Sequence, residues 1–356
     1  MITAHYSKYL LNFKRPSGTS RGVLKTKETF FIYLKDTVRQ GIGECAVFRG
    51  LSSDDLPDYE EKLAWTCAHI HLGKEQLLQK LQAYPSLQFG LEQAFLSLNA
   101  PTPFELYPTG FVKKKQPIAI NGLIWMGDTE FMKAQIEEKL EQGFATLKMK
   151  IGALDFEKEC ALLSSIRKRF SADQITLRVD ANGAFSPSDA LEKLKRLAAY
   201  DLHSIEQPIR QGQPEAMAAL CKNTPLPIAL DEELIGVFSK DKKEQLLQEI
   251  QPQYIILKPS LLGGIQGSEE WISIAEKHQI AWWVTSALES NIGLNAIAQW
   301  TSTLNTKLPQ GLGTGSLFTN NFDAPLLVDQ GALYCNSQKE WNFETIKKEL
   351  TFKSHK

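Results

Sequence analysis

The sequence predicts an α/β protein in which a barrel of alternating strands and helices follows a smaller α+β region. The first observation is a repeat, since Asp180, Glu206 and Asp231 each end a short apolar stretch, at separations of 26 and 25 residues. That separation is the length of one strand, one helix and two loops, which is one βα unit. The second observation is that strand and helix patterns alternate from Pro117 onward, whereas they do not alternate in the first hundred residues.

The first hundred residues are predicted to hold strands followed by helices, as an α+β cap beside the barrel. Two loops, Pro16–Arg21 and Phe48–Asp55, are rich in glycine, serine and charge. They either close over an active site or are ordinary surface loops. The three lysines Lys113–Lys115 are expected to form a solvated linker before the barrel. The expected strands are 1–13, 30–35 and 41–46, and the expected helices are 58–71, 74–83 and 86–98.

The barrel region shows seven βα units in order. Apolar residues recur on one helical face within Asp155–Phe170, and Ser186-Pro187 is a good N-cap and first residue for the next helix. A last short strand is expected within Gln310–Phe318. The segment Leu326–Cys335, with a turn at its centre, is expected to return to the cap. The expected barrel strands are 118–121, 146–150, 176–180, 204–206, 228–231, 254–258 and 281–285.

Composition limits the classes of partner. Forty basic and forty-one acidic residues give a formal net charge of −1, so neither nucleic acid nor a membrane surface is an expected partner. The oligomeric state is left open. The five cysteines are widely spread without a Cys-x-x-Cys pair, so we expect buried free thiols. No apolar run approaches eighteen residues, and the protein is expected to be cytoplasmic and reduced.

The three acids predict a metal site. If the strands are parallel and close into a barrel, their carboxyl ends converge on one face, where barrel enzymes hold their catalytic residues. Three clustered carboxylates repel one another unless a cation lies among them. An all-oxygen set that is open to water and substrate suits a hard divalent ion such as Mg²⁺.

Three lysines predict chemistry at the same face. Lys148 and Lys150 are two residues apart on one strand and therefore share a face. A second cation nearby disfavours protonation of the first, which is one way to obtain a neutral amine base. Lys258 follows Asp231 by 27 residues, across the barrel from Lys150. This arrangement suits removal of a proton α to a carboxylate, although an isolated lysine pair is as often structural.

The order of Lys-x-Lys, Asp180-Ala181-Asn182, Glu206-Gln207-Pro208, Asp231-Glu232 and Lys258 resembles the muconate-lactonizing-enzyme subgroup of the enolase superfamily, across essentially the whole chain. The resemblance implies a modified TIM barrel, (β/α)₇β, at 101–320, with an α+β capping domain at 1–100 to which 321–356 returns. It also implies the following site: Mg²⁺, with Mn²⁺ as a substitute, on Asp180, Glu206 and Asp231; Lys150 as the base with Lys148 beside it; and Asn182 and Glu232 supporting the metal ligands.

The stretches Thr285–Gly293 and Gly311–Gly315 resemble the o-succinylbenzoate synthase family. In that family the corresponding residues contact the succinyl side of the substrate, which implies Ser286, Gly313 and Thr314 here. A plain tight turn at the barrel rim is the alternative. The implied activity is that of a carbon–oxygen lyase of menaquinone biosynthesis, which dehydrates 2-succinyl-6-hydroxy-2,4-cyclohexadiene-1-carboxylate to 2-succinylbenzoate. Lys150 would remove the α-proton and return it to the departing hydroxyl on the same face, while Lys258 stays charged.

Two other functions stay open. A racemase of N-acyl- or N-succinylamino acids, or a dipeptide epimerase, would use the same metal site, with Lys150 and Lys258 both acting as acid and base. Dipeptide epimerases of this subgroup typically carry Asp-x-Asp where this chain has Gly313-Thr314-Gly315, which argues against that activity. A non-catalytic binding barrel would be expected to lack a ligand or a lysine, and none is missing.

The sequence also predicts roles for His203 and Arg49. His203 is expected to be a packing residue and no metal ligand. Arg49 either pairs with a substrate carboxylate under a closed Phe48–Asp55 loop or is exposed to solvent.

Overall fold

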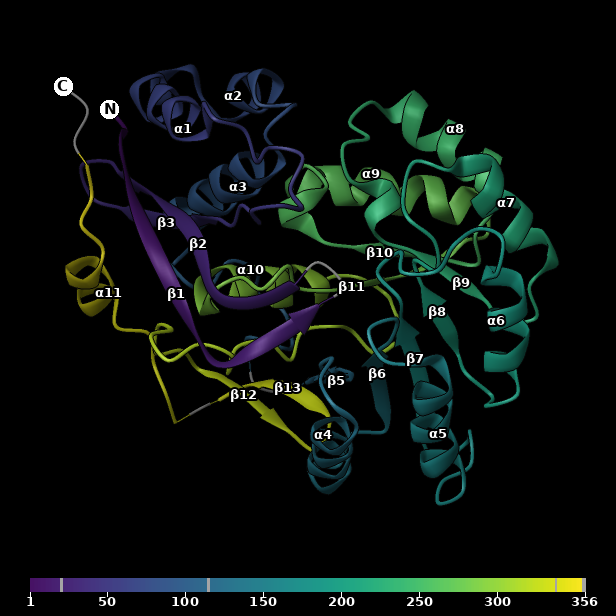
Figure 1. Ribbon diagram of the computed structural model, residues 1–356. Helices are drawn as coiled ribbons and strands as arrows, with labels where there is room; N and C mark the ends of the chain where they lie inside the picture. Colours follow the sequence, from purple (N-terminus) through teal and green to yellow (C-terminus); the bar gives the residue numbers. More distant parts are fainter. Residues whose placement is uncertain (20–21, 114–115, 337, 354–356) are drawn as a thin grey trace.

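The computed structural model describes residues 1–19, 22–113, 116–336 and 338–353. A curled parallel sheet wrapped by helices lies beside a long antiparallel sheet with its own helices (Figure 1). The expectations for Ser20–Arg21 and Lys114–Lys115 lie outside the described residues. Within the described ranges, no helix is long and apolar enough to cross a membrane.

The antiparallel sheet and three helices form the capping region. Its strands are β1 (Thr3–Thr19), β2 (Gly22–Lys35) and β3 (Gln40–Cys45), in the order β1-β2-β3. The helices are α1 (Tyr59–Ala68), α2 (Lys74–Lys80) and α3 (Pro85–Asn99), with the short 3₁₀ helix η1 (Ile70–Leu72) between the first two.

Helix α3 packs directly on β3 because both elements carry glycine at the contact. A Cβ atom at Gly43 would lie 1.9 Å from the carbonyl oxygen of Gly90. No larger residue fits at Gly43 without moving a backbone. This close approach holds α3 against the sheet.

The β1–β2 hairpin is longer than the sequence predicted. The second strand was expected to begin at Phe30, but β2 begins at Gly22, and pairing continues to Thr19↔Gly22. The outer half of β2 is polar and lacks the apolar alternation that indicates a strand. It is a strand because β1 supplies hydrogen-bond partners, and this tertiary effect overrides local preference.

The parallel sheet forms most of a barrel. Its seven strands follow the order β11-β10-β9-β8-β7-β6-β5. Parallel bridges Thr285↔Gly311 and Ile120↔Gln310 join the two edges, so Gln310–Gly311 is the predicted last strand. The strands are β5 (Gly122–Ile124), β6 (Thr146–Lys150), β7 (Thr176–Asp180), β8 (Ser204–Glu206), β9 (Ile228–Leu230), β10 (Tyr254–Leu257) and β11 (Ala281–Val284).

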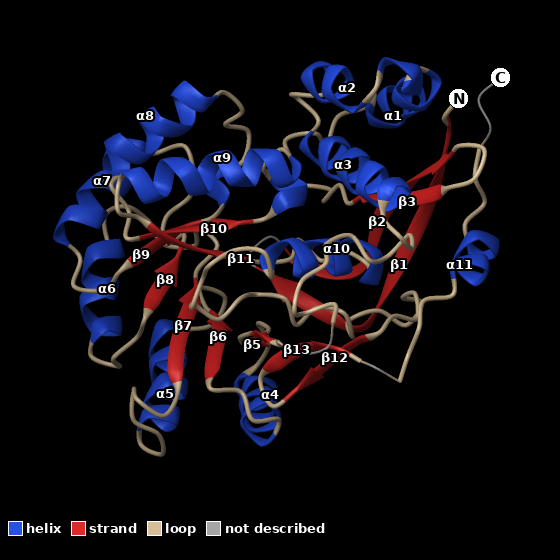
Figure 2. Cartoon of the chain, turned by 180° about the vertical axis from the view of Figure 1, so that it is seen from behind, coloured by secondary structure: helices blue, strands red, loops and turns tan. Residues whose placement is uncertain are grey.

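Seven helices lie on the outside of this sheet (Figure 2). Each follows a barrel strand, as in a (β/α)₇β barrel, so the predicted fold class is confirmed. The helices are α4 (Thr129–Glu141), α5 (Phe156–Arg167), α6 (Ala190–Ala198), α7 (Pro214–Asn223), α8 (Lys240–Ile250), α9 (Gly264–Lys277) and α10 (Asn291–Thr301), with the 3₁₀ turns η2 (Glu232–Leu234) and η3 (Pro259–Leu261).

Two boundaries differ from the predictions. The expected first barrel strand, 118–121, contains β4 (Ile118–Ala119), which pairs outside the barrel, and β5 takes its place. Helix α6 begins at Ala190 rather than after Ser186, because the Ser186 hydroxyl bonds the side chains of Ser188 and Asp189 and caps no helix N–H.

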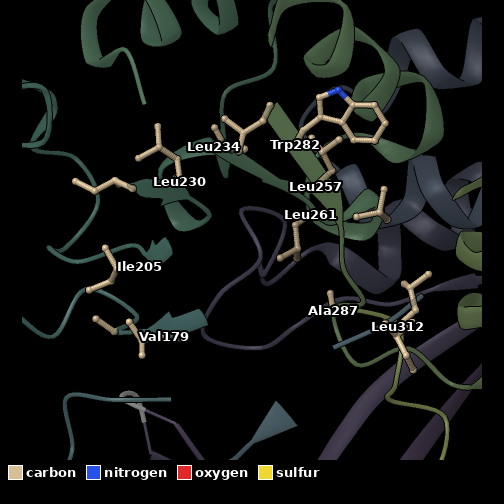
Figure 3. Packing of buried hydrophobic residues seen from close by; sticks show 14 of the residues in the cluster. Val179, Ile205, Leu230, Leu234, Leu257, Leu261, Trp282, Ala287 and Leu312 are labelled. Carbon is tan, nitrogen blue, oxygen red and sulfur yellow. The ribbon is translucent and has the colours of Figure 1, made fainter. Parts of the chain in front are cut away.

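Strand alternation separates the packing face from the site. Val179, Ile205 and Leu257 are fully buried among other apolar side chains (Figure 3). Their neighbours Asp180, Glu206 and Lys258 point the other way, because successive strand side chains face opposite sides. The apolar face thus holds the helices, and the opposite face is left for polar groups.

The C-terminal segment forms the predicted hairpin of β12 (Leu326–Asp329) and β13 (Ala332–Cys335). This hairpin pairs with β4 and not with β1–β3. The chain then forms α11 (Phe343–Glu349), and Lys353 pairs with Tyr6 of β1, so both termini lie at the capping region (Figure 1). As predicted, Cys45, Cys67, Cys160 and Cys221 are buried free thiols, whereas Cys335 is half-buried.

Candidate active site

Three carboxylates lie at the carboxyl ends of adjacent strands. Register places Lys150 beside Asp180 and Asp180 beside Glu206 on β6, β7 and β8. Asp231 directly follows β9. The three acids are at most 2% exposed, so the barrel wall removes them from bulk water.

Three lysines lie among these acids. The Nζ atom of Lys148 is 2.6 Å from Glu206 Oε2 and 3.1 Å from Asp180 Oδ2. The Nζ atom of Lys150 is 2.9 Å from the same Oδ2. The Nζ atom of Lys258 forms an ion pair with Asp231 Oδ2 and is 4.0 Å from Glu206 Oε1. The structure therefore brings together every acid and lysine that the sequence selected.

Burial and the neighbouring charges shift the pKa values of the acids and lysines in this cluster. Burial alone would lower the pKa of Lys148, but the charges of Asp180 and Glu206 outweigh it and raise that pKa above its ordinary value. Burial opposes ionisation of Asp180, yet Lys148 and Lys150 hold its pKa far below the usual range. Burial and the adjacent Asp180 charge raise the pKa of Glu206 to about 8. Lys148 is thus held as an ammonium, which the lysine pair alone did not predict.

The donor set fits a hard cation. All three acids offer only oxygen, and Glu206 Oε1 is buried with no hydrogen-bond partner among the described residues. The lysine ammonium groups lie among the oxygens, so no group of three His, Cys, Asp or Glu in the described ranges has the spacing of a metal cage. The oxygen chemistry of these three acids, rather than their spacing in this structure, is what suits a divalent ion.

Asn182 and Glu232 connect Lys150 to the acids. The backbone N–H of Asn182 donates to Asp180 Oδ1 at 3.0 Å, and its Nδ2 donates to Glu232 Oε1 at 3.0 Å. Its Oδ1 accepts from Lys150 Nζ at 2.6 Å. Asn182 has a left-handed backbone, φ 44°, which asparagine adopts more readily than most residues. The turn after β7 therefore fixes Lys150 relative to Asp180.

A cavity of about 690 Å³ opens above this cluster. Its lining includes Lys148, Lys150 and Lys258 from the barrel. The capping region contributes side chains from both segments that were expected to be loops: Pro16 and Ser17, which belong to the end of strand β1 rather than to a loop, and Phe48 and Leu51, which follow β3. The interpretation of these segments as covers for the site is thus favoured over ordinary surface loops.

Arg49 does not line this cavity. Its guanidinium pairs with Glu28 and, at 2.7 Å, with Asp55 Oδ1. These contacts brace the loop from outside, so the suggested pairing of Arg49 with a substrate is not what the structure favours.

The opposite wall of the cavity carries the residues implied for the succinyl side. Ser286, Gly313 and Thr314 all line it. The Thr314 hydroxyl donates to Ser286 Oγ at 2.9 Å. The backbone N–H groups of Gly313, Thr314 and Gly315 have no acceptor among the described residues, so they are available to an anion.

Sequence reasoning missed three side chains near the site. Trp125 lies beside Lys150, whose Nζ is 6.0 Å from the centre of its ring. Arg178 is buried two residues before Asp180, with its guanidinium 4.1 Å from the Trp283 ring. The two-residue spacing that selected the lysine pair could have found Arg178. The third side chain is Glu289, and no spacing or motif in the sequence pointed to it.

The predicted packing role of His203 is confirmed. Its ring lies 4.9 Å from that of Tyr254, and Nδ1 lies 2.9 Å from Ser204 Oγ. Burial lowers its pKa to about 4, so it is neutral near pH 7.

The barrel, the capping region and the lysine–carboxylate cluster define an enzyme of the enolase class. Family models agree: residues 131–338 match the model described as "Enolase C-terminal domain-like", and residues 1–98 match "MenC, N-terminal domain". The o-succinylbenzoate synthase of Desulfotalea psychrophila is 46% identical over 359 residues, which cover 92% of this chain and 97% of the relative. This chain belongs to the o-succinylbenzoate synthase family, and it is an enzyme of the hydro-lyase class.

A solved structure and a relative with a different activity extend this comparison. The crystal structure of MenC from Desulfotalea psychrophila superposes with a TM-score of 0.83 at 43% identity, covering 94% of this chain and 99% of that one. The L-Ala-D/L-Glu epimerase of Bacillus subtilis is 29% identical, covering 92% of this chain and 89% of the epimerase.

Proposed function

We propose that this chain catalyses the syn elimination of water from 2-succinyl-6-hydroxy-2,4-cyclohexadiene-1-carboxylate, giving 2-succinylbenzoate for menaquinone biosynthesis. Membership of the o-succinylbenzoate synthase family supports the reaction class. The observation that carries the proposal is the placement of Lys150 and Lys258 in one cavity, on strands separated by β7, β8 and β9. A flat substrate between them meets one lysine on each face.

Asp180, Glu206 and Asp231 are the residues that would hold a divalent cation, which we propose to be Mg²⁺ with Mn²⁺ as a substitute. Their oxygen-only donors support this assignment, as does Glu206 Oε1, which accepts no hydrogen bond from the described residues. When bound, the cation supplies positive charge to the substrate carboxylate as its α-carbon loses a proton.

Lys150 acts as the base in this proposal. Its Nζ hydrogen bonds to Asp180 and Asn182 aim the amine at the centre of the cavity. After taking the α-proton, the same ammonium can protonate the departing hydroxyl without leaving its face of the ring, as a syn elimination requires. Lys148, held by Glu206 and Asp180, balances the charge of the acids beside the base.

Lys258 acts as a fixed cation on the other face. It stabilises the negative charge that spreads over the ring when the proton leaves. The succinyl carboxylate is assigned to the wall formed by Ser286, Gly313 and Thr314, where the backbone N–H groups of Gly313 and Thr314 have no acceptor among the described residues. Phe48 and Leu51 close the apolar side and exclude water.

The same pair of lysines favours a second candidate, a racemase of N-succinylamino acids. With a lysine on each face, one can remove an α-proton while the other delivers it from the opposite side. The relative named as an epimerase shows that this fold supports such chemistry. Glycine and threonine at Gly313-Thr314-Gly315, where dipeptide epimerases carry two aspartates, disfavour a dipeptide substrate.

An ultraviolet assay of ring aromatisation with Mg²⁺ tests the proposal, with polarimetry on N-succinylamino acids in parallel. Lys150→Ala and Lys258→Ala are each expected to lower kcat by at least about 10²-fold, the scale of one lost acid–base or charge-stabilising group. Lys277→Ala is the matched control, because Lys277 pairs with Glu244 on the barrel exterior. Racemisation without dehydration would overturn the proposed substrate and keep the site.

A further inference from the structure

Glu289 is a fully buried carboxylate that touches neither the acids nor the lysines of the site. Its Oε1 accepts a hydrogen bond from Ser260 Oγ at 2.5 Å. Its Oε2 accepts from Ser286 Oγ at 2.6 Å and from the Ala287 backbone N–H at 2.8 Å. Glu289 thus ties η3, which directly follows Lys258, to the cavity wall after β11.

These contacts decide which way the Ser286 hydroxyl points. Ser286 gives its only proton to Glu289, and its oxygen accepts from the Thr314 hydroxyl and from the Leu288 N–H at 3.0 Å. A serine hydroxyl has one donor and two acceptor positions, so all three are used. Thr314 has in turn given its proton to Ser286. Neither hydroxyl therefore offers a proton to a substrate carboxylate while Glu289 holds Ser286.

The same contacts hold a strained turn. Leu288 has φ 64°, a left-handed conformation that is strained for a residue with a Cβ atom. Hydrogen bonds from Ala287 N–H to Glu289 and from Leu288 N–H to Ser286 close this turn. Leu288 is thereby presented to the cavity, which it lines.

The capping region places buried polar groups beside this turn. Lys27 on β2 is 6% exposed, and its Nζ has no hydrogen-bond partner among the described residues. Burial lowers the pKa of Lys27, and the charges of Glu44 and Glu289 oppose that effect. Glu44 itself accepts from the Ser290 N–H at 2.9 Å and from the Gly293 N–H at 2.9 Å, so it joins the capping region to the segment that follows the turn.

We propose that Glu289 is a positioning residue for substrate binding. It fixes the Ser286 hydroxyl and the Ala287–Leu288 turn, so that the wall meets the succinyl carboxylate with backbone N–H groups rather than with hydroxyl protons. The kinetic part of this inference rests on the proposed function, whereas the geometric part does not.

The test compares Glu289→Met with Glu289→Gln. Methionine keeps the length but accepts no strong hydrogen bond, so Ser286 and the turn are released. The value of KM is expected to rise about tenfold, the scale of one misplaced hydrogen bond, with kcat changed less than about threefold. In Glu289→Gln, the amide oxygen can face Ser286 and Ala287 while the NH₂ faces the rotatable Ser260 hydroxyl. This variant is expected to keep KM within about twofold of the native value.

Two controls separate positioning from stability. Glu92→Gln removes another buried carboxylate at the boundary between capping region and barrel, outside the cavity lining, and is expected to leave KM unchanged. In a Ser286→Ala background, Glu289→Met is expected to add less than about twofold to KM, because both changes remove the same contact. If the KM increases of Ser286→Ala and Glu289→Met multiply in the double variant, Glu289 does not act through Ser286. An equal rise of KM in Glu289→Gln and Glu289→Met would also contradict the positioning role.

A crystal structure of Glu289→Met gives a readout that does not depend on the substrate. Release of Leu288 from its left-handed conformation and rotation of Ser286 are expected. If Leu288 and Ser286 keep their positions in Glu289→Met, the inference is wrong, even if the enzyme is a synthase. A moved wall in a protein without dehydratase activity would keep the inference and reject the proposed reaction.

Discussion

Glu92 is expected to make the stability of this protein fall as pH rises through the neutral range. The residue lies on α3 and is 7% exposed. Its oxygens accept from the backbone N–H groups of Ile265, at 2.5 Å, and Gln266, at 3.1 Å, in the first turn of α9. Burial raises its pKa to about 7, and those backbone hydrogen bonds oppose the effect only in part.

The sign follows from proton binding. A carboxyl group whose pKa is higher in the folded chain than in the unfolded chain binds its proton more tightly when folded. Its contribution is complete below the ordinary pKa of 4.5 and is lost as pH rises through about 7. A shift of that size corresponds to about 3 kcal/mol of unfolding free energy in all, of which about 2 kcal/mol is lost between pH 5 and pH 8.

Urea unfolding of the native chain and of Glu92→Gln at pH 5, 6, 7 and 8 measures this effect. The amide does not titrate, so the stability difference between the two proteins should shift by about 2 kcal/mol in favour of Glu92→Gln over this range. Glu276→Gln, on the exposed side of α9, is the control and should show no such trend. A difference that stays constant with pH would refute the reasoning, because it would mean that the α9 N-terminus keeps Glu92 ionised when folded.

Three other outcomes are expected. Trp283→Ala empties a fully buried site against Arg178 inside the barrel and should lower the unfolding free energy by about 3 to 5 kcal/mol in urea titrations; a loss below about 1 kcal/mol would contradict tight packing there. Dialysis against EDTA should abolish turnover until Mg²⁺ or Mn²⁺ is returned, and Mg²⁺ alone should raise the melting temperature of the native chain more than that of Asp231→Asn. Arg49→Ala should change stability by less than about 1 kcal/mol and leave KM unchanged, since its ion pairs are exposed; a large rise of KM would place Arg49 in the substrate site after all.

The sequence by itself determined the barrel and the core of its site. Asp180, Glu206 and Asp231 recur at the length of one βα unit, and parallel strands carry such residues to one face whatever the loops between them do. Lys148 and Lys150 share a face because strand side chains alternate. The spacing of the acids and the spacing of the two lysines are local patterns, so they can be recognised in a single sequence.

Only the tertiary structure decided which other residues reach the cavity. The outer half of β2 has no strand pattern of its own and becomes a strand through pairing with β1. The exchange of β4 for β5 in the barrel depends on β13, which lies more than two hundred residues away in the sequence. Pairings of this range leave no mark in the local pattern of either partner.

Glu289 shows the same limit at the level of one side chain. In the sequence it is an acid in a turn, where a solvated position is the ordinary expectation. In the folded chain it is fully buried and accepts hydrogen bonds from Ser260, Ser286 and Ala287, with the side chain of Lys27 buried nearby. Burial makes such a contact set decisive, because an unpartnered carboxylate inside a protein is costly. The periodic acids and lysines could be predicted, whereas a group whose role depends on partners from three separate segments could be found only after folding brings them together.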